Sequence, residues 1–307
     1  MSGGPNASTA SSPAGSVSGV VRGLLGRAID YAGLFPPAAL DMEAALRNYV
    51  AYRAGADSAL LGRFVAPASR LGELAQTIER IGASDVSVSA VLGANRAADF
   101  DQVSAFNARR VRGAVVDSIE ARAERPDVIY EVASRASGFD VFVELPLDGE
   151  LEWLVDAARA SNVRAKIRTG GVTADAFPRT RSVVRFMRAC LDAGVPFKAT
   201  AGLHHPLTGT YALTYAPDSP RGPMFGFLNA FLAAAFLGVG ISNEDAARIL
   251  DERDPSAFAL TGRGVEWRGH HVDAAQLAAI HAGVFGSFGS CSFREPVDEL
   301  RSMALLA

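Results

Sequence analysis

The stretches that decide the fold are two short strand-like runs, VRAKIRTGG at residues 163–171 and PFKATAGLHHP at residues 196–206. Each run places a lysine, Lys166 or Lys198, four residues before a glycine. A segment of helix length separates the runs, so we expect two neighbouring parallel strands joined by a helical crossover. Lysine is depleted from buried strands because its ammonium group must be desolvated there. Two lysines at matched heights therefore indicate paired chemistry.

The same alternation of strand-type and helix-type segments runs from residue 28 onward. Helix-type segments separate seven expected strands, at residues 28–35, 58–65, 86–92, 111–117, 140–145, 163–169 and 196–203. A less distinct eighth unit has its strand at 258–267 and its helix at 273–281. Eight such units close into a (β/α)8 TIM barrel, an α/β fold. An open doubly wound sheet is the alternative, but no Gly-rich dinucleotide loop follows the first strand.

Length and composition fit one globular domain at residues 19–307 after a tail. The chain has 307 residues, of which 49% are hydrophobic and 21% charged. Residues 1–18 are almost all Ser, Gly, Ala and Pro, which predicts a disordered tail rather than a signal peptide. Two cysteines fit a reducing cytoplasm.

The charge and hydropathy patterns narrow the range of partners. A net charge of -3 and a pI near 6.0 carry no electrostatic signature of nucleic-acid binding. The longest apolar run, at 224–240, is too short for a membrane span and predicts a buried helix. We expect a cytoplasmic protein that acts on a small molecule. The sequence leaves open whether the protein is a homo-oligomer.

The two lysines suggest Schiff-base chemistry. Adjacent strands lie about 4.8 Å apart, so the two ammonium groups would approach within roughly 5 Å. At an effective dielectric constant of about 20 their repulsion is roughly 3 kcal/mol, enough to lower one lysine's pKa by about 2. A lysine that is partly neutral can attack a carbonyl, and the second cation can stabilise developing negative charge. The alternative is that each lysine neutralises a carboxylate, such as Asp117 or Glu144.

The motif residues carry a family resemblance. Lys-x-x-Thr-Gly at 166–170, followed by Phe-Lys-x-x-x-Gly at 197–202, resembles strands six and seven of deoxyribose-phosphate aldolase, a class I aldolase on a TIM barrel. The resemblance implies that Lys166 forms the imine and that Lys198 lowers its pKa. The family's Gly-rich phosphate loop is replaced here by Leu-His-His-Pro at 203–206, so the substrate stays open.

An aldolase also needs a group that moves protons. Asp117 and Glu144 are expected to end strands four and five, where catalytic groups of a barrel project. Each is a candidate proton shuttle or a counter-ion. His204 and His205 follow strand seven, and one ring can act as an acid or base or bind an oxyanion. Adjacent histidines on an extended chain point in opposite directions, so we expect no metal and no other cofactor.

Further candidates for substrate contacts follow from strand position. If Lys166 faces inward, the period of two also turns Arg168 inward, and Lys198 shares its face with two more residues. The expected substrate-binding residues are Arg168, Thr169, Thr200, Gly202, His205, Arg63 at the end of strand two, and Tyr31 at the end of strand one. Cys291 invites a nucleophile interpretation, although a free cysteine is usually a small buried hydrophobe. The segment 207–223 is a lid candidate, and 289–296 is expected to cap the last helix.

The leading hypothesis is a class I lyase of the aldolase type that acts on a small carbonyl compound, such as a sugar or sugar phosphate. One alternative keeps the barrel and drops the covalent step: an isomerase, epimerase or hydrolase of a small anionic metabolite. The other is a non-catalytic barrel that binds a small anion, which fold alone does not exclude.

Overall fold

The computed structural model describes residues 16–306 and contains a closed barrel of eight parallel strands. Around the barrel the strands follow the order β1, β13, β7, β6, β5, β4, β3, β2. Their bounds are β1 (Ile29–Tyr31), β2 (Leu61–Pro67), β3 (Ser87–Val91), β4 (Val115–Arg122), β5 (Asp140–Glu144), β6 (Arg164–Arg168), β7 (Phe197–Thr200) and β13 (Phe285–Ser290). The predicted TIM-barrel architecture is confirmed.

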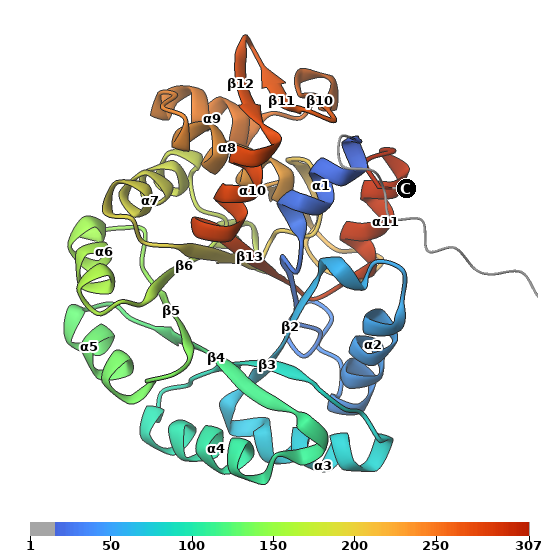
Figure 1. Ribbon diagram of the computed structural model, residues 1–307, viewed down its shortest axis with the longest axis vertical. Coiled ribbons are helices and arrows are strands. Elements are labelled where there is room, and N and C mark those ends of the chain that lie inside the picture. Colours follow the sequence, from blue (N-terminus) through green and yellow to red (C-terminus); the bar gives the residue numbers. More distant parts are fainter. Residues whose placement is uncertain (1–15, 307) are drawn as a thin grey trace, which may run out of the picture.

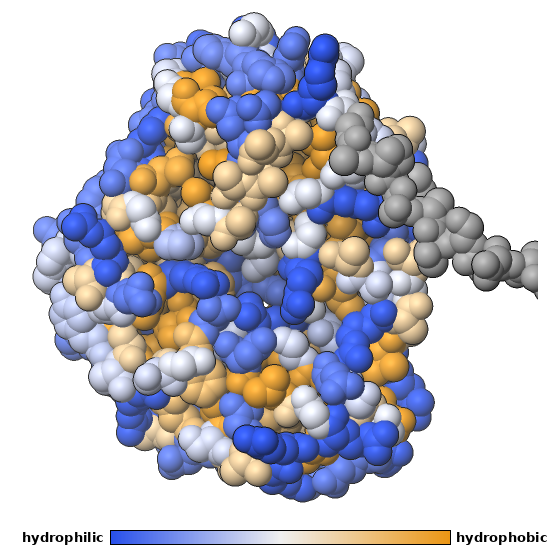
Figure 2. Space-filling model, in the orientation of Figure 1, coloured by the Kyte–Doolittle hydropathy of each residue, from blue (hydrophilic) through white to orange (hydrophobic). Residues whose placement is uncertain are grey.

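Helices form a ring around these strands (Figure 1). They are α1 (Val17–Leu25), α2 (Met42–Ala54), α3 (Leu71–Ile81), α4 (Arg96–Arg109), α5 (Pro126–Arg135), α6 (Leu151–Ala160), α7 (Thr180–Ala193), α8 (Phe227–Gly238), α9 (Asn243–Asp251), α10 (Ala274–Gly283) and α11 (Arg294–Ser302). Single 3-10 turns lie at Ser58–Leu60, Ala68–Arg70, Val111–Gly113, Ala174–Ala176 and Pro255–Ala257. Viewed along the barrel, hydrophilic residues gather around the hollow at the centre of the ring (Figure 2).

Helix α3 shows why these segments fold as they do. Its buried residues Leu71, Leu74 and Ile78 recur at a spacing of three and four, which places one apolar stripe against the strands. The helix ends at Gly82, whose φ of +71° is the left-handed conformation that glycine adopts without steric cost.

The predicted eighth strand is wrong. Residues 258–267 instead contribute to a three-stranded antiparallel sheet of β10 (Ala259–Thr261), β11 (Gly264–Trp267) and β12 (His270–Asp273), which projects beyond α8 and α10 in Figure 1. The barrel is closed by β13, with sequence FGSFGS. The small residues that this strand contributes, Ser287 and Gly289 among them, weaken the usual apolar strand pattern.

The apolar run at 224–240 forms α8, and residues 227–237 are all buried, as expected. Within residues 16–306, no helix combines the length and the apolar character needed to cross a membrane. The lid candidate at 207–223 contains a short hairpin between β8 (Gly209–Ala212) and β9 (Arg221–Met224).

The chain between residues 16 and 18 differs from the expected tail. The Ser16 hydroxyl accepts a hydrogen bond from the Gly19 amide at 3.0 Å and caps α1, whose Val21 and Leu24 are buried. The capping bond and the apolar face therefore order residues 16–18. Residues 1–15 of the predicted tail lie outside the described part of the chain.

Candidate active site

Lys166 and Lys198 lie directly opposite each other on β6 and β7. Both residues are buried, with 4% and 1% of their surface exposed. The matched register predicted from the sequence is confirmed. Two buried ammonium groups at one height require nearby acceptors, because an unpaired buried charge costs several kcal/mol.

Glu120 supplies the central acceptor. Its Oε2 lies 2.7 Å from Lys166 Nζ and its Oε1 lies 2.8 Å from Lys198 Nζ, so one carboxylate bridges both lysines. The Glu120 carboxylate accepts a third hydrogen bond, from the Ser89 hydroxyl to Oε1 at 2.7 Å. Glu120 was not predicted because strand four was expected to end at Asp117, whereas β4 continues to Arg122.

A second carboxylate, that of Asp30, also binds Lys198. Its Nζ donates to Asp30 Oδ2 at 2.5 Å, and Asp30 also accepts from the Ser287 hydroxyl at 2.8 Å and from the Arg63 amide at 2.8 Å. Burial alone would lower the pKa of Lys198, but the carboxylates of Asp30 and Glu120 outweigh it and raise this pKa. Lys198 is therefore a fixed cation.

Lys166 has a second partner at the upper edge of the barrel. Its Nζ lies 3.0 Å from Glu144 Oε2, and Glu144 Oε1 accepts from Arg168 Nε at 3.2 Å. Burial would raise the pKa of Glu144, but Lys166 and Arg168 outweigh it and lower this pKa. The two lysines likewise overcome the burial of Glu120 and hold its pKa well below the usual range. Both carboxylates are ionised acceptors at neutral pH.

The charges of this network balance. The direct repulsion expected between the two lysines is replaced by attraction to a shared carboxylate, so the lysines do not form a bare cationic pair. The expectation that each lysine neutralises a carboxylate is correct for Glu144 and wrong for Asp117. Three carboxylates face three cations: Asp30, Glu120, Glu144, Lys166, Lys198 and Arg168.

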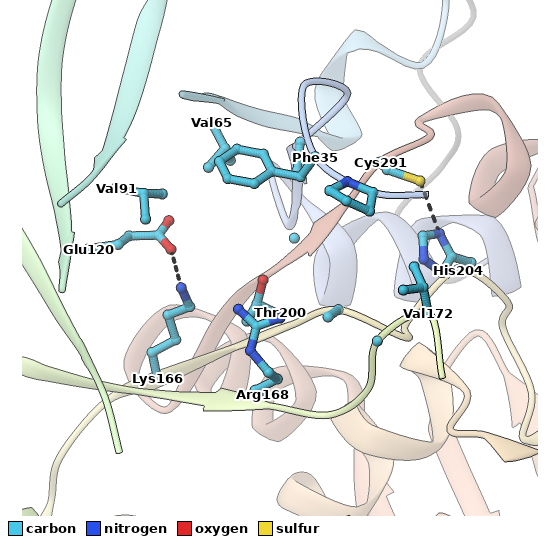
Figure 3. A pocket seen from close by; sticks show the side chains of 15 residues that line it. Phe35, Val65, Val91, Glu120, Lys166, Arg168, Val172, Thr200, His204 and Cys291 are labelled. Atoms are coloured by element: carbon cyan, nitrogen blue, oxygen red, sulfur yellow. Dashed lines mark hydrogen bonds and ion pairs between the residues drawn. The ribbon is translucent and has the colours of Figure 1, made fainter. Parts of the chain in front are cut away.

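A cavity of about 250 Å³ lies above the network, at the carboxyl ends of the strands. Lys166 and Glu120 line it, whereas Lys198 does not (Figure 3). The polar part of the lining includes Arg168, Thr200 and His204, and the apolar part includes Phe35, Val65, Val91 and Val172. The cavity therefore offers one lysine, one guanidinium and one imidazole to a small molecule.

His204 reaches this cavity from the loop after β7. Its Nδ1 lies 3.3 Å from Ser290 Oγ and 3.8 Å from Cys291 Sγ. Burial, with a contribution from His205, lowers the pKa of His204 to about 4, so the imidazole is neutral at pH 7. Burial also raises the pKa of Cys291, which makes this residue a thiol and a poor nucleophile. His204 is the better candidate for a base.

Asp117 and Arg63 lie away from the cavity, contrary to expectation. Arg63 Nε donates to Asp117 Oδ1 and its Nη2 donates to Asp140 Oδ2, each at 2.7 Å. Asp117 is the third residue of β4 and Arg63 the third of β2, so both face the amino-terminal end of the barrel. The two strands begin later and extend further than predicted, which moves these residues away from the carboxyl edge.

Three residues expected to contact the substrate, Thr169, Gly202 and Tyr31, instead pack against other parts of the protein. The Thr169 hydroxyl donates to the Ala201 carbonyl at 2.6 Å, which ties the loops after β6 and β7 together. Gly202, with φ of +74°, packs so closely on Gly170 that a Cβ on it would lie 3.0 Å from the Gly170 Cα. Tyr31 packs edge-on against Tyr52. None of the three expected residues lines the cavity.

His205 faces a separate, smaller cavity, and its Nδ1 lies 2.7 Å from Glu299 Oε1.

The segment 289–296, expected to cap α11, also lines the main cavity. Gly289 and Ser290 end β13, and Gly289 and Cys291 line the main cavity. The hydroxyl of Ser292 accepts from the Glu295 amide at 3.1 Å at the start of α11.

A compositional signal points to the same site. The chain contains two lysines, Lys166 and Lys198, against 28 arginines. Arginine serves every other cationic position of the chain, although a guanidinium cannot act as an amine nucleophile. Both ammonium groups that lysine contributes to the chain thus meet at one carboxylate, Glu120.

Comparisons with known proteins carry no argument about the fold or the activity of this chain. No protein-family model matches the chain, and no curated protein matches its sequence. Among solved structures, it is similar to lysine/ornithine decarboxylase complexed with cadaverine from Vibrio vulnificus, at 12% identity and a TM-score of 0.36. The match covers 60% of this chain and 50% of that one, so the chain spans half the length of the protein it matches.

Proposed function

We propose that this barrel is a class I lyase of the aldolase type, which makes or breaks a carbon–carbon bond beside a carbonyl through an imine at Lys166. The observation that carries the proposal is the asymmetry of the two lysines. Lys166 lines the cavity, whereas Lys198 lies at the same height and is enclosed by Asp30 and Glu120. This asymmetry supports Lys166 as the nucleophile and Lys198 as a fixed positive charge.

The first step needs a neutral amine. Glu144, 3.0 Å from Lys166 Nζ, accepts the proton of the ammonium group. The amine then attacks the carbonyl carbon, a C–N bond forms, and the carbonyl electron pair moves to oxygen, which takes one proton from the nitrogen and a second from Glu144. Loss of this oxygen as water leaves a positively charged iminium.

The second step breaks the carbon–carbon bond. Neutral His204 removes the proton from the β-hydroxyl group, the Cα–Cβ bond breaks, and its electron pair moves toward the iminium nitrogen to give an enamine. The β fragment leaves as an aldehyde. His204 returns its proton to the enamine carbon, and water hydrolyses the iminium and frees Lys166. The water lost on forming the imine balances the water consumed.

The cavity suggests the size and charge of the substrate. A volume of about 250 Å³ holds a compound of a few carbons. Arg168, half exposed at the mouth, supplies a guanidinium suited to a carboxylate or phosphate. The resemblance of residues 166–170 and 197–202 to deoxyribose-phosphate aldolase supports the same chemistry, with Glu120 as an added bridge between the lysines.

The test is reductive trapping, and the chain makes it unusually specific. The protein is incubated with cyanoborohydride and a panel of small aldehydes, ketones and 2-oxo acids, then cut with an endoproteinase that cleaves only after lysine. An adduct at Lys166 blocks that cut and leaves fragments 1–198 and 199–307. An adduct at Lys198 would leave fragments 1–166 and 167–307 instead. Turnover without an adduct at Lys166 would refute the imine.

One observation favours a non-covalent alternative. Lys166 already has two carboxylate partners, which is also the arrangement of a purely structural ion pair. Arg168 would then bind an anionic substrate while His204 isomerises or hydrolyses it. Lys166→Arg separates the two, because arginine keeps the charge and forms no imine. The lyase proposal predicts loss of turnover, with Lys198→Arg as the matched control for folding.

A further inference from the structure

A second cavity of about 100 Å³ lies beside the main one. His204 and Gly171 line both cavities, and the second is also lined by His205, Tyr211 and Glu295. The mechanism proposed above uses only His204 of this group. The second cavity therefore holds polar side chains with no role in the lyase chemistry.

Two of these side chains, His205 and Glu295, converge with Glu299 of α11 on one point. His205 Nδ1 lies 2.7 Å from Glu299 Oε1, and single ligand atoms of His205, Glu295 and Glu299 all lie within 4.8 Å of one another. Glu295 and Glu299 are one helical turn apart on α11, so both carboxylates face the same side. The ring of His205 stacks on Tyr211 with 3.5 Å between centroids, which fixes the direction of its Nδ1.

The basic neighbours of the two carboxylates in the cluster are imidazoles. Within residues 16–306, neither Glu295 nor Glu299 forms a salt bridge with a lysine or an arginine. The Glu295 carboxylate accepts from the Tyr215 hydroxyl at its Oε2 at 3.2 Å, and His204 Nδ1 lies 3.6 Å from the same oxygen. The carboxylates beneath the main cavity, in contrast, are each matched by a cation.

We propose that His205, Glu295 and Glu299 bind one divalent transition-metal cation of the Zn²⁺ class. One imidazole nitrogen and two carboxylate oxygens are ligands that Zn²⁺ accepts, and three protein ligands leave one position for water. Ca²⁺ prefers six to eight oxygen ligands and Mg²⁺ a near-octahedral oxygen shell, so both fit this set poorly. The cation neutralises the two carboxylates.

The site would connect α11 to the loop after β7. His205 is the neighbour of His204 in the chain, so a cation here holds the segment that carries the proposed base. The site is thus a positioning device outside the reaction steps, and it stands independently of the proposed lyase activity. Binding is measurable with Zn²⁺ alone.

The experiment is calorimetric titration of the chelator-treated full chain with ZnCl₂. The wild type should bind Zn²⁺ at one site, and Glu299→Gln and His205→Ala should each weaken binding by at least about 100-fold, the upper range for loss of even a supporting partner. His271→Ala is the matched control, because His271 lies 3.9 Å from Glu266 and no third ligand joins them within residues 16–306, and it should bind like the wild type.

Two further measurements keep the result clear. Zn²⁺ should raise the melting temperature of the wild type and of His271→Ala, since a ligand that binds only the folded state stabilises it. The melting temperature of Glu299→Gln should not change, because this variant lacks one of the ligands. Cys291→Ser should bind like the wild type, because the thiol is outside the proposed ligand set. Absence of saturable binding, or full binding by both ligand variants, would overturn the site, as would loss of binding in Cys291→Ser.

Discussion

The substitution Glu120→Gln tests the centre of the network. It keeps the shape of the side chain and removes the one charge that both lysines share. Loss of one partner from a buried ion pair costs about 3–5 kcal/mol. Lys198 keeps Asp30 and Lys166 keeps Glu144, so the cost should lie near the lower end, about 3 kcal/mol. Domains of this kind are stable by about 5–15 kcal/mol, which makes such a loss easy to measure.

The assay is equilibrium unfolding in urea at pH 7, scored by the midpoint at constant slope. Asp117→Asn is the matched control, because Asp117 also forms a salt bridge, with Arg63, but its side chain is 37% exposed. An exposed pair contributes about 1 kcal/mol or less. If Glu120→Gln lies within about 1 kcal/mol of the wild type and matches the control, Glu120 does not hold the lysines as argued.

The pH dependence of folding stability gives an independent test of the network. The pKa of Glu120 is lowered in the folded state, so its contribution is present above the unfolded value of about 4.3 and is lost as pH falls through the folded pKa. The pKa of Lys198 is raised, so its contribution is present below about 10.4 and is lost as pH rises through its folded pKa. The difference between wild type and Glu120→Gln should therefore narrow below about pH 4.

Three further predictions concern the cavity and the loops above it. His204→Gln should lower kcat by about 100-fold in a turnover assay, and the wild-type rate should fall only as pH drops toward about 4, where His204 becomes protonated; an acid limb near 6.5 would contradict this. Arg168→Gln should raise KM for an anionic substrate by about tenfold and leave kcat nearly unchanged, and an equal fall in kcat would show a role in the chemistry. Gly170→Ala should destabilise the fold by about 2 kcal/mol in thermal unfolding, because its Cβ would lie 2.5 Å from the Phe177 ring and 2.9 Å from the Gly202 Cα; an unchanged melting temperature would mean that the loops separate freely.

Local sequence patterns predicted which strands and helices form better than they predicted where those elements end. The expected strand at 163–169 matches β6, since its register is set by a motif of alternating side chains. Strand four was expected to end at Asp117 but continues to Arg122, because pairing with β3 and β5 extends it. That shift hid Glu120 and moved Asp117 away from the site. The last strand escaped prediction because Ser287 and Gly289 interrupt its apolar pattern; Ser287 donates to the buried Asp30, and Gly289 lines the main cavity.

The sequence by itself determined the barrel, the buried helix α8 and the matched height of Lys166 and Lys198, because each depends on a repeat or a spacing within one or two segments. The tertiary structure alone decided the charge balance. Glu144 faces Lys166 from the neighbouring strand β5, whereas only barrel closure brings Asp30 of β1 and Glu120 of β4 within 3.0 Å of Lys198. Coulombic interactions depend on distance in space, which spacing along the chain does not encode. For that reason the sequence indicated two repelling lysines, and the folded barrel pairs them through one carboxylate.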